Sequence, residues 1–228
     1  MLIAFEGIDG SGKATQSRMF AEKLHEETSL PVRQLSFPAY DETYCGPLIR
    51  AYLDGELGGL NDNHPLLVSL LYALDRYEVW EAIATSGVIV ADRYTPSNVA
   101  HQCGKLAAKG RRWDELAQQI LEIEHDLLSL PMPDFVFYLD IAPEQSAERT
   151  GKFGGKDIHE EARDYQAGVR EVYLARGNST ACWYCVDNFD EGTPRSPMAI
   201  AAEIWTIFTD SALGKELLSC QTIKPSAG

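Results

Sequence analysis

Phe5-Glu6-Gly7-Ile8-Asp9-Gly10-Ser11-Gly12-Lys13-Ala14-Thr15-Gln16 is the stretch that decides the fold. The apolar run Met1 to Phe5 before it predicts a buried parallel strand, and Gln16 to Leu24 after it predicts a helix. A strand, a glycine-rich loop and a helix in this order form the context in which backbone N–H groups surround phosphates. The sequence therefore predicts a phosphate-binding loop at the start of an α/β domain.

The loop fits the pattern G-x-x-x-x-G-K-[ST] through Gly7, Gly12 and Lys13, and departs from it at Ala14. Glycines let the backbone approach an anion closely, and Lys13 would reach the outer phosphates as a mobile point charge. Ala14 lacks the hydroxyl that normally reaches magnesium. We expect Thr15, or a carboxylate acting through water, to take its place.

Composition bounds the class of protein. The 228 residues are 45% hydrophobic and 24% charged, as expected for one globular α/β domain. No window approaches about 20 apolar residues, so we expect no membrane span, and the immediate first strand leaves no room for a signal peptide. A formal net charge of −14 argues against nucleic-acid binding.

Five cysteines, an odd number, favour the cytoplasm over a disulfide framework. Among them, Cys182 and Cys185 read as ordinary core and strand residues.

Apolar, β-branched runs alternate with helical patterns along the chain. The expected strands are 2–6, 32–37, 88–92, 135–140 and 183–186, and the expected helices are 13–27, 46–53, 65–86, 97–109, 113–130, 143–149, 158–175 and 197–209. Such alternation predicts an α/β fold, a doubly wound five-stranded parallel sheet with helices on both faces. We expect a single domain over residues 1–212 and a C-terminal tail over 213–228.

Ligands of such sheets bind beyond the carboxyl ends of the strands. Asp92 and Arg93 end the third strand, where a carboxylate and a guanidinium suit magnesium and phosphate, although a structural ion pair is equally compatible. Tyr72 and Arg76 are four residues apart and share one helical face. Together they could hold a nucleotide by its base and its phosphate, although Tyr72 alone reads as a core residue.

A basic run follows the fourth strand. Arg149, Lys152 and Lys156 place three cations and no acid within eight residues. Composition alone favours a solvated loop.

Five segments in order, 5–16, 37–40, 70–76, 92–98 and 157–160, resemble thymidylate kinases. The resemblance runs from Met1 to about Tyr173. It implies the P-loop kinase fold with a small mobile lid at about 150–157, a homodimer, and transfer of the γ-phosphoryl of ATP to dTMP with Mg²⁺.

The resemblance also implies roles for individual residues. Those of the ATP site are Gly7, Ile8, Asp9, Gly10, Ser11, Gly12, Lys13, Ala14, Thr15 and Arg149, the last near the adenine. Those of the dTMP site are Asp9, Phe37, Tyr40, Tyr72, Arg76, Arg93, Asn98, His101 and Gln102, with both arginines on the phosphate, Tyr72 stacked on thymine and Asn98 and Gln102 at the base edge. The expected catalytic residues are Lys13, Asp92, Arg93, Lys152 and Lys156, and the expected metal-binding residues are Asp9, Thr15 and Asp92.

Three positions depart from the family pattern. Some members carry an arginine at the position of Gly10, whereas others place basic residues in the lid, and this chain resembles the second type. The resemblance therefore reverses the solvated-loop interpretation of Arg149 to Lys156. Ala39 stands where an arginine is frequent. His101 stands where an aromatic residue is associated with excluding a ribose 2′-hydroxyl, which leaves deoxy selectivity less secure than base selectivity.

Two other functions share parts of this pattern. A deoxynucleoside kinase also has the glycine loop and a strand-end Asp-Arg, but it would not need Arg76 and Arg93 on an acceptor phosphate. A non-catalytic nucleotide-binding protein is suggested only by Ala14, and Lys13, Asp92 and the basic run oppose it.

Overall fold

The computed structural model describes all residues except 29, 60–61, 84–86, 151–155 and 220–228, and for 156–162 it describes the backbone only. The strands are β1 (Leu2–Glu6), β2 (Val32–Ser36), β3 (Val88–Asp92), β4 (Phe135–Asp140), β5 (Trp183–Asp187), β6 (Phe189–Asp190) and β7 (Thr193–Pro194). The helices are α1 (Lys13–Thr28), α2 (Cys45–Leu53), α3 (Pro65–Ala82), α4 (Thr95–Ala107), α5 (Asp114–Leu121), the π-helix η1 (Glu122–Leu127), α6 (Pro143–Thr150), α7 (Lys156–Gly177), α8 (Pro197–Asp210) and α9 (Ala212–Ser219).

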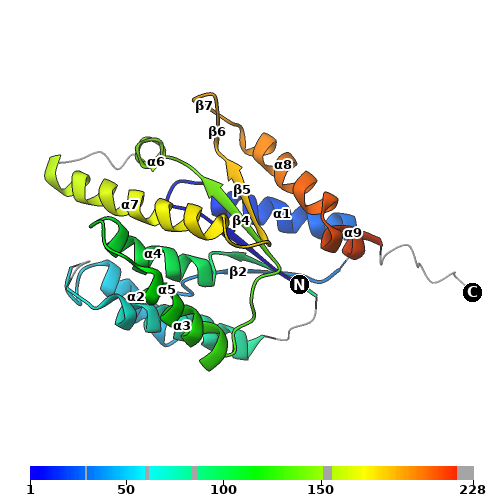
Figure 1. Ribbon diagram of the computed structural model, residues 1–228. Helices are drawn as coiled ribbons and strands as arrows, with labels where there is room; N and C mark the ends of the chain where they lie inside the picture. Colours follow the sequence, from blue (N-terminus) through cyan, green and yellow to red (C-terminus); the bar gives the residue numbers. More distant parts are fainter. Residues whose placement is uncertain (29, 60–61, 84–86, 151–155, 220–228) are drawn as a thin grey trace, which may run out of the picture.

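The central sheet is parallel, with strand order β2-β3-β1-β4-β5. In Figure 1 the helices α1, α8 and α9 lie on one side of this sheet, and α3, α4, α5 and α7 lie on the other. Strand β1 is central, between β3 and β4, and all five of its residues are buried. The doubly wound α/β fold predicted from the sequence is therefore confirmed.

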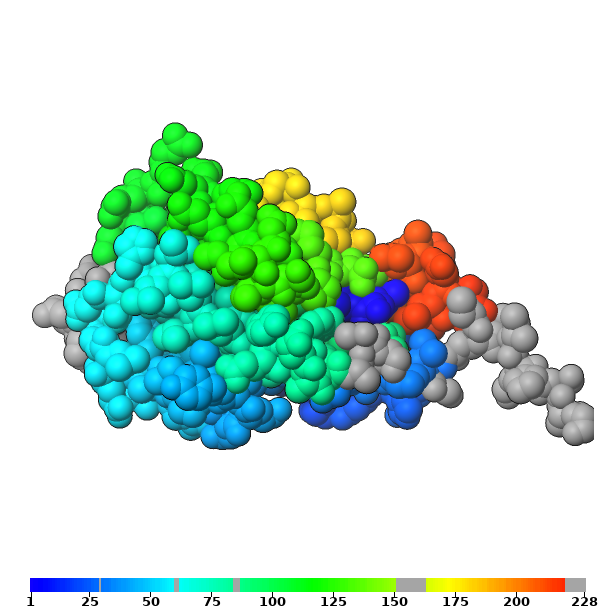
Figure 2. All heavy atoms as spheres, turned by 90° about the horizontal axis from the view of Figure 1, so that it is seen from below, coloured from blue at the N-terminus to red at the C-terminus, as the bar shows by residue number. Residues whose placement is uncertain are grey.

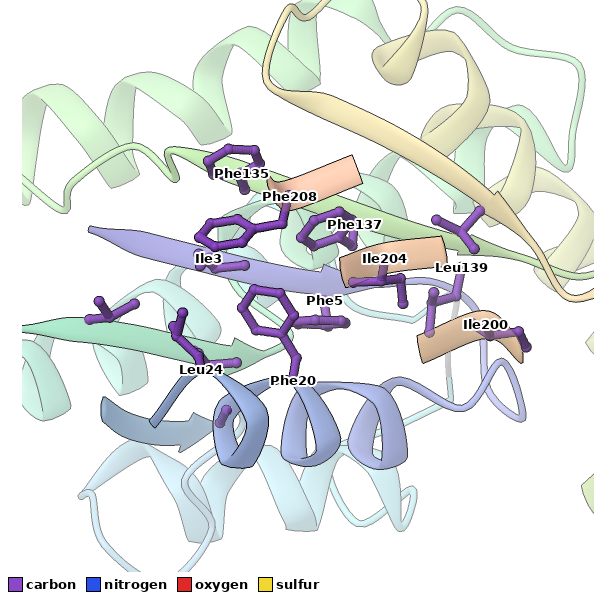
Figure 3. Close-up of a cluster of buried hydrophobic side chains, with 14 residues drawn as sticks. Ile3, Phe5, Phe20, Leu24, Phe135, Phe137, Leu139, Ile200, Ile204 and Phe208 are labelled. Atoms are coloured by element: carbon purple, nitrogen blue, oxygen red, sulfur yellow. The ribbon is translucent and has the colours of Figure 1, made fainter. Parts of the chain in front are cut away.

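Alternate residues of the central strands face opposite layers. Figure 3 shows Ile3 and Phe5 of β1 with Phe135 and Phe137 of β4, packed against Phe20 of α1 and residues of α8. The intervening residues of these strands enter the cores under α3, α4 and α7. Burial of both faces explains why these strands read as continuous apolar runs in the sequence. The site at their carboxyl ends is thus built on strands that are buried on both faces.

Four features differ from the sequence-based expectation. Helix α3 ends at Ala82, and residues 84–86 of its expected end lie outside the described residues. The helix expected over 113–130 divides into α5 and η1. A short antiparallel hairpin, β6–β7, follows β5. Helix α9 occupies part of the expected tail, and Leu217 packs against the core between α1 and α8.

None of the described helices is both long and apolar enough to cross a membrane.

Candidate active site

The loop between β1 and α1 needs glycine for conformation and for space. Gly7, Gly10 and Gly12 have positive φ angles of 147°, 74° and 87°, which L-residues with a side chain rarely adopt. A Cβ atom on Gly7 would lie 2.7 Å from the carbonyl oxygen of Leu139, and one on Gly10 would lie 3.1 Å from that of Ser146. The loop is therefore pressed against β4 and α6, with its backbone available to an anion.

Lys13 begins α1 and folds back over this loop. Its Nζ donates to the carbonyl oxygen of Ile8 at 2.8 Å and to Oγ of Ser11 at 3.4 Å. Burial, together with the positive charge of Arg93, lowers the pKa of Lys13 to about 7. A bound phosphate would favour the charged ammonium, because a nearby opposite charge stabilises the ionised form.

Arg93 follows β3 and connects the loop with the neighbouring helix α4. Its guanidinium donates to Oδ1 of Asp9 at 2.7 Å, to Oγ of Ser97 at 3.3 Å and to Nε2 of His101 at 3.1 Å. A fourth contact joins it to the carbonyl oxygen of Gly7 at 3.4 Å. Its φ of 68° is unusual for a residue with a long side chain, and such strain concentrates at functional sites. The fold holds this cation in one place at the loop.

Glu6 is a buried carboxylate beneath Arg93. It accepts from the backbone N–H of Tyr94 at 2.8 Å, from Oγ of Ser97 at 2.5 Å and from Oη of Tyr173 at 2.9 Å. Burial raises the pKa of Glu6, which its hydrogen-bond partners and Arg93 oppose. Glu6 thus ties β1 to α4 and α7 and fixes the backbone that carries Arg93.

A cavity of about 250 Å³ opens beside Arg93, between α2, α3, α4 and α7. Its lining includes all nine residues expected at the dTMP site: Asp9, Phe37, Tyr40, Tyr72, Arg76, Arg93, Asn98, His101 and Gln102. The walls also contain Tyr52, Lys105 and Tyr165, which the sequence analysis did not single out. Side chains from six separated segments converge here, as expected at the carboxyl edge of a parallel sheet.

Arg76 enters the cavity wall from α3 with a buried partner from η1. Its guanidinium forms two hydrogen bonds to the carboxylate of Glu124, one of them from Nε to Oε2 at 3.0 Å. The two side chains are 2% and 0% exposed. Glu124 also accepts from Nδ2 of Asn98 at 2.7 Å. This grouping places Arg76 with a residue expected at the base edge and differs from the expectation that Arg76 and Arg93 together hold the phosphate.

The loop after β2 is anchored by a carboxylate of α3. Asp75 accepts from the backbone N–H of Ala39 at 3.0 Å and from Oγ1 of Thr43 at 2.5 Å. These bonds place Phe37 and Tyr40, on the same loop, in the cavity wall.

Arg149 lies on the other side of the phosphate loop. It donates to Oδ1 of Asn188 at 2.9 Å, and its guanidinium lies 5.1 Å from the ring centre of Phe189. Residues Asn188 and Phe189 belong to the hairpin segment that the sequence analysis missed. Lys152 lies outside the described residues, and Lys156 is described only as the first residue of α7.

The expected metal-binding residues differ in their surroundings. Oδ1 of Asp92 is a buried acceptor with no hydrogen-bond partner among the described residues, and burial raises the pKa of this carboxyl while Lys13 and Arg93 lower it. Asp9 is paired with Arg93. Thr15 is exposed, on the first turn of α1. Within the described residues, no group of three or more His, Cys, Asp or Glu side chains could hold a metal ion.

One missed residue had a sequence signal. Glu124 lies four residues after Ile120 and eight after Leu116, so it falls on the apolar face of the helix that those residues define. A carboxylate at a buried position is rare unless it is paired. Lys105 and Tyr165 lie within expected helices without any comparable pattern.

Comparison with known proteins agrees with this geometry. Residues 5–192 match the family described as thymidylate kinase. The thymidylate kinase of Plasmodium falciparum is 33% identical over 175 residues, covering 75% of this chain and 74% of the relative. That of Dictyostelium discoideum is 30% identical over 177 residues, covering 76% and 71%.

A solved structure extends the agreement to three dimensions. The thymidylate kinase of Candida albicans, described as having broad substrate specificity, superposes with a TM-score of 0.65 at 26% identity and covers 95% of this chain and 92% of its own. The fold, the phosphate loop and the family match point to one conclusion. The chain belongs to the thymidylate kinase family of P-loop nucleoside monophosphate kinases, which phosphorylate dTMP.

Proposed function

We propose that this site binds ATP on the loop after β1 and dTMP in the neighbouring cavity, and transfers the γ-phosphoryl of ATP to dTMP. The position of Arg93 carries the proposal, because its guanidinium contacts the carbonyl of Gly7 in the loop and also lines the cavity. A phosphate of each substrate can therefore lie against the same cation.

Two polar atoms of the cavity wall suit the edge of thymine. Nε and Nη2 of Arg76 are bonded to Glu124, which leaves Nη1 as a donor for a base carbonyl. Both bonds of the Asn98 amide nitrogen go to protein acceptors, Ser69 and Glu124. Oδ1 of Asn98 is buried without a partner among the described residues. The donor Nη1 of Arg76 and the acceptor Oδ1 of Asn98 match a base that has a carbonyl beside N3–H. Thymine and uracil have this arrangement. The N3 lone pair of cytosine would instead face Oδ1.

The cations of the site offset repulsion between the two substrates. Two unit charges 4 Å apart interact by about 1 kcal/mol in water and by about 4 kcal/mol at an effective dielectric near 20. Lys13 and Arg93 lie where the phosphates would meet. Positioning and charge neutralisation carry most of the catalysis of phosphoryl transfer, so no covalent enzyme intermediate is required. The acceptor phosphate is largely ionised at neutral pH, which makes a general base dispensable.

Mg²⁺ fits the carboxylates beside the loop. The unpartnered Oδ1 of Asp92 is an oxygen ligand of the kind that Mg²⁺ prefers, directly or through water. We propose that Asp92 and Asp9 hold the ion together with ATP oxygens, and that Thr15 contributes its hydroxyl or a water contact. The ion would neutralise charge on the phosphates.

Lys152 and Lys156 of the basic run supply the remaining charge in this proposal. Replacing Lys152 and Lys156 together by alanine is expected to lower kcat at least tenfold, about 1.4 kcal/mol. Steady-state ADP release at saturating ATP and dTMP measures this. Exchange of two exposed lysines remote from the site, Lys23 and Lys215, provides the control. An unchanged kcat in the double variant would refute the role of the run.

A homodimer is proposed through the exposed side of α3. Figure 2 views the face on which α2 and α3 lie. Leu67 and Leu74 are 57% and 39% exposed on α3 and, being seven residues apart, they share one helical face. Leu127 of the adjacent η1 is 73% exposed. Apolar side chains gathered in this way are typical of protein interfaces.

Replacing Leu74 by glutamate is expected to convert the dimer to a monomer, because two carboxylates would be buried against each other. Sedimentation equilibrium at micromolar concentration measures the mass. Leu213→Glu, on the remote helix α9, is the matched control. A wild-type protein that sediments as a monomer would contradict this interface.

We propose that the protein acts in the cytoplasm. All four cysteines among the described residues, Cys45, Cys103, Cys182 and Cys185, are free thiols, as is usual in a reducing compartment.

A coupled ADP-release assay with dTMP and thymidine as alternative acceptors tests the proposed reaction. The expected result is turnover with dTMP and none above background with thymidine, because thymidine lacks the phosphate that Arg93 would bind. Comparable turnover with thymidine would indicate a deoxynucleoside kinase, and ATP binding without turnover would indicate a non-catalytic nucleotide-binding protein.

A further inference from the structure

Lys105 is a buried cation in the wall of the cavity. Lys105 is 5% exposed. Its Nζ donates to Oη of Tyr52 at 2.8 Å and to Oε1 of Gln102 at 2.7 Å. The ammonium also lies 5.3 Å from the ring centre of Tyr52. None of the salt bridges between described residues involves Lys105. A lysine buried against two neutral partners beside a ligand cavity calls for an explanation, because desolvating an ammonium is costly.

The contact with Gln102 determines which way its amide points. A charged lysine has three donors and no acceptor, so only the amide oxygen of Gln102 can face it. The amide nitrogen, on the other branch of the same planar group, then points away from Lys105. Gln102 lines the cavity, and its Nε2 forms no hydrogen bond with any described residue. A donor is thereby held ready for a ligand.

The place of Gln102 relates this donor to the base. Gln102 follows Asn98 by four residues, one turn further along the same face of α4. The cavity wall would then present a donor from Arg76, an acceptor from Asn98 and a donor from Gln102. Thymine and uracil carry the complementary sequence of carbonyl, N3–H and carbonyl.

We propose that Lys105 is a positioning residue for base recognition, which fixes the amide of Gln102 so that Nε2 donates to a carbonyl of the pyrimidine. This inference rests on the proposed binding of dTMP in the cavity. Without the cation, the amide can rotate and turn Oε1 toward the base carbonyl, where two acceptors would repel each other.

A double-mutant cycle of Lys105→Met and Gln102→Leu tests the proposal. Each single variant is expected to raise the KM for dTMP about tenfold, as for the loss of one hydrogen bond, with kcat within about twofold of wild type. The double variant is expected to resemble either single variant, because both changes remove the same donor. A KM for dTMP near the wild-type value in Lys105→Met, or a hundredfold rise in the double variant, would overturn the proposal.

Two further variants separate this role from a structural one. Lys105→Arg keeps a side chain that can only donate, so its KM for dTMP should stay within about threefold of wild type. This variant tests the proposal even if Lys105→Met fails to fold. A tenfold rise in the KM of a folded Lys105→Arg would contradict the proposal. Lys23→Met is the matched control, since Lys23 also lies over an aromatic ring, that of Trp205, but away from the cavity. Turnover of dTMP by the wild-type protein tests the proposed function separately, so a failure of the cycle with an active wild type bears on Lys105 alone.

Discussion

Replacement of Glu124 by glutamine is expected to lower the free energy of unfolding by about 3–5 kcal/mol, the usual cost of removing one partner of a buried ion pair. Arg76 and Glu124 are 2% and 0% exposed, so the substitution leaves a buried guanidinium without its paired charge. Because Glu124 also holds the amide of Asn98, the KM for dTMP should rise in the folded fraction.

Urea unfolding followed by circular dichroism measures this change. Glu22→Gln is the matched control, because Glu22 pairs with Arg18 on the surface and exposed pairs contribute less than about 1 kcal/mol. The double variant Arg76→Met, Glu124→Gln should regain much of the stability, since it leaves no buried charge, but it should not regain the affinity for dTMP. A loss of stability below about 1 kcal/mol in Glu124→Gln would show that the pair is not buried in solution.

Replacement of Arg93 by methionine is expected to lower kcat/KM for dTMP about a thousandfold. Removing one preorganised group that stabilises developing charge costs on the order of 10²–10³, and arginines in phosphoryl transfer reach or exceed that range. Four contacts hold Arg93 in position, so its charge is preorganised at the phosphate loop.

Steady-state kinetics with varied dTMP at saturating ATP measure the effect of Arg93→Met. Thermal unfolding shows whether the variant remains folded, since Asp9 and Glu6 lose a neighbouring cation. Arg18→Met, an exposed arginine on α1, is the control. A decrease of kcat/KM smaller than tenfold in a folded Arg93→Met would show that Arg93 does not have the catalytic role proposed for it.

The strands could be predicted from sequence because their signals are local. The limits of β1, β3 and β4 agree with the prediction, since each is an apolar run that ends at an acidic residue at the carboxyl end of the strand. The residues of the cavity wall were expected from the resemblance to thymidylate kinases. Topology alone predicts only that the ends of neighbouring parallel strands meet at one edge.

The rest depended on contacts between distant segments. The partner of Arg76 was not predicted, because Glu124 is 48 residues away and no local pattern joins the two residues. The division of α5 from η1 has no turn residue to mark it. The contact between Lys105 and Tyr52 joins α4 to α2 across the cavity, and no sequence pattern near either residue predicts it.

The cavity is expected to accept a pyrimidine monophosphate through a carbonyl beside N3–H. The most direct test is ATP-dependent ADP release at equal concentrations of dTMP, dUMP, dCMP and dGMP. We expect that dTMP is phosphorylated and that kcat/KM for dCMP is at least a hundredfold lower, because the N3 lone pair of cytosine would face the buried Oδ1 of Asn98. Equal turnover of dCMP and dTMP would contradict it.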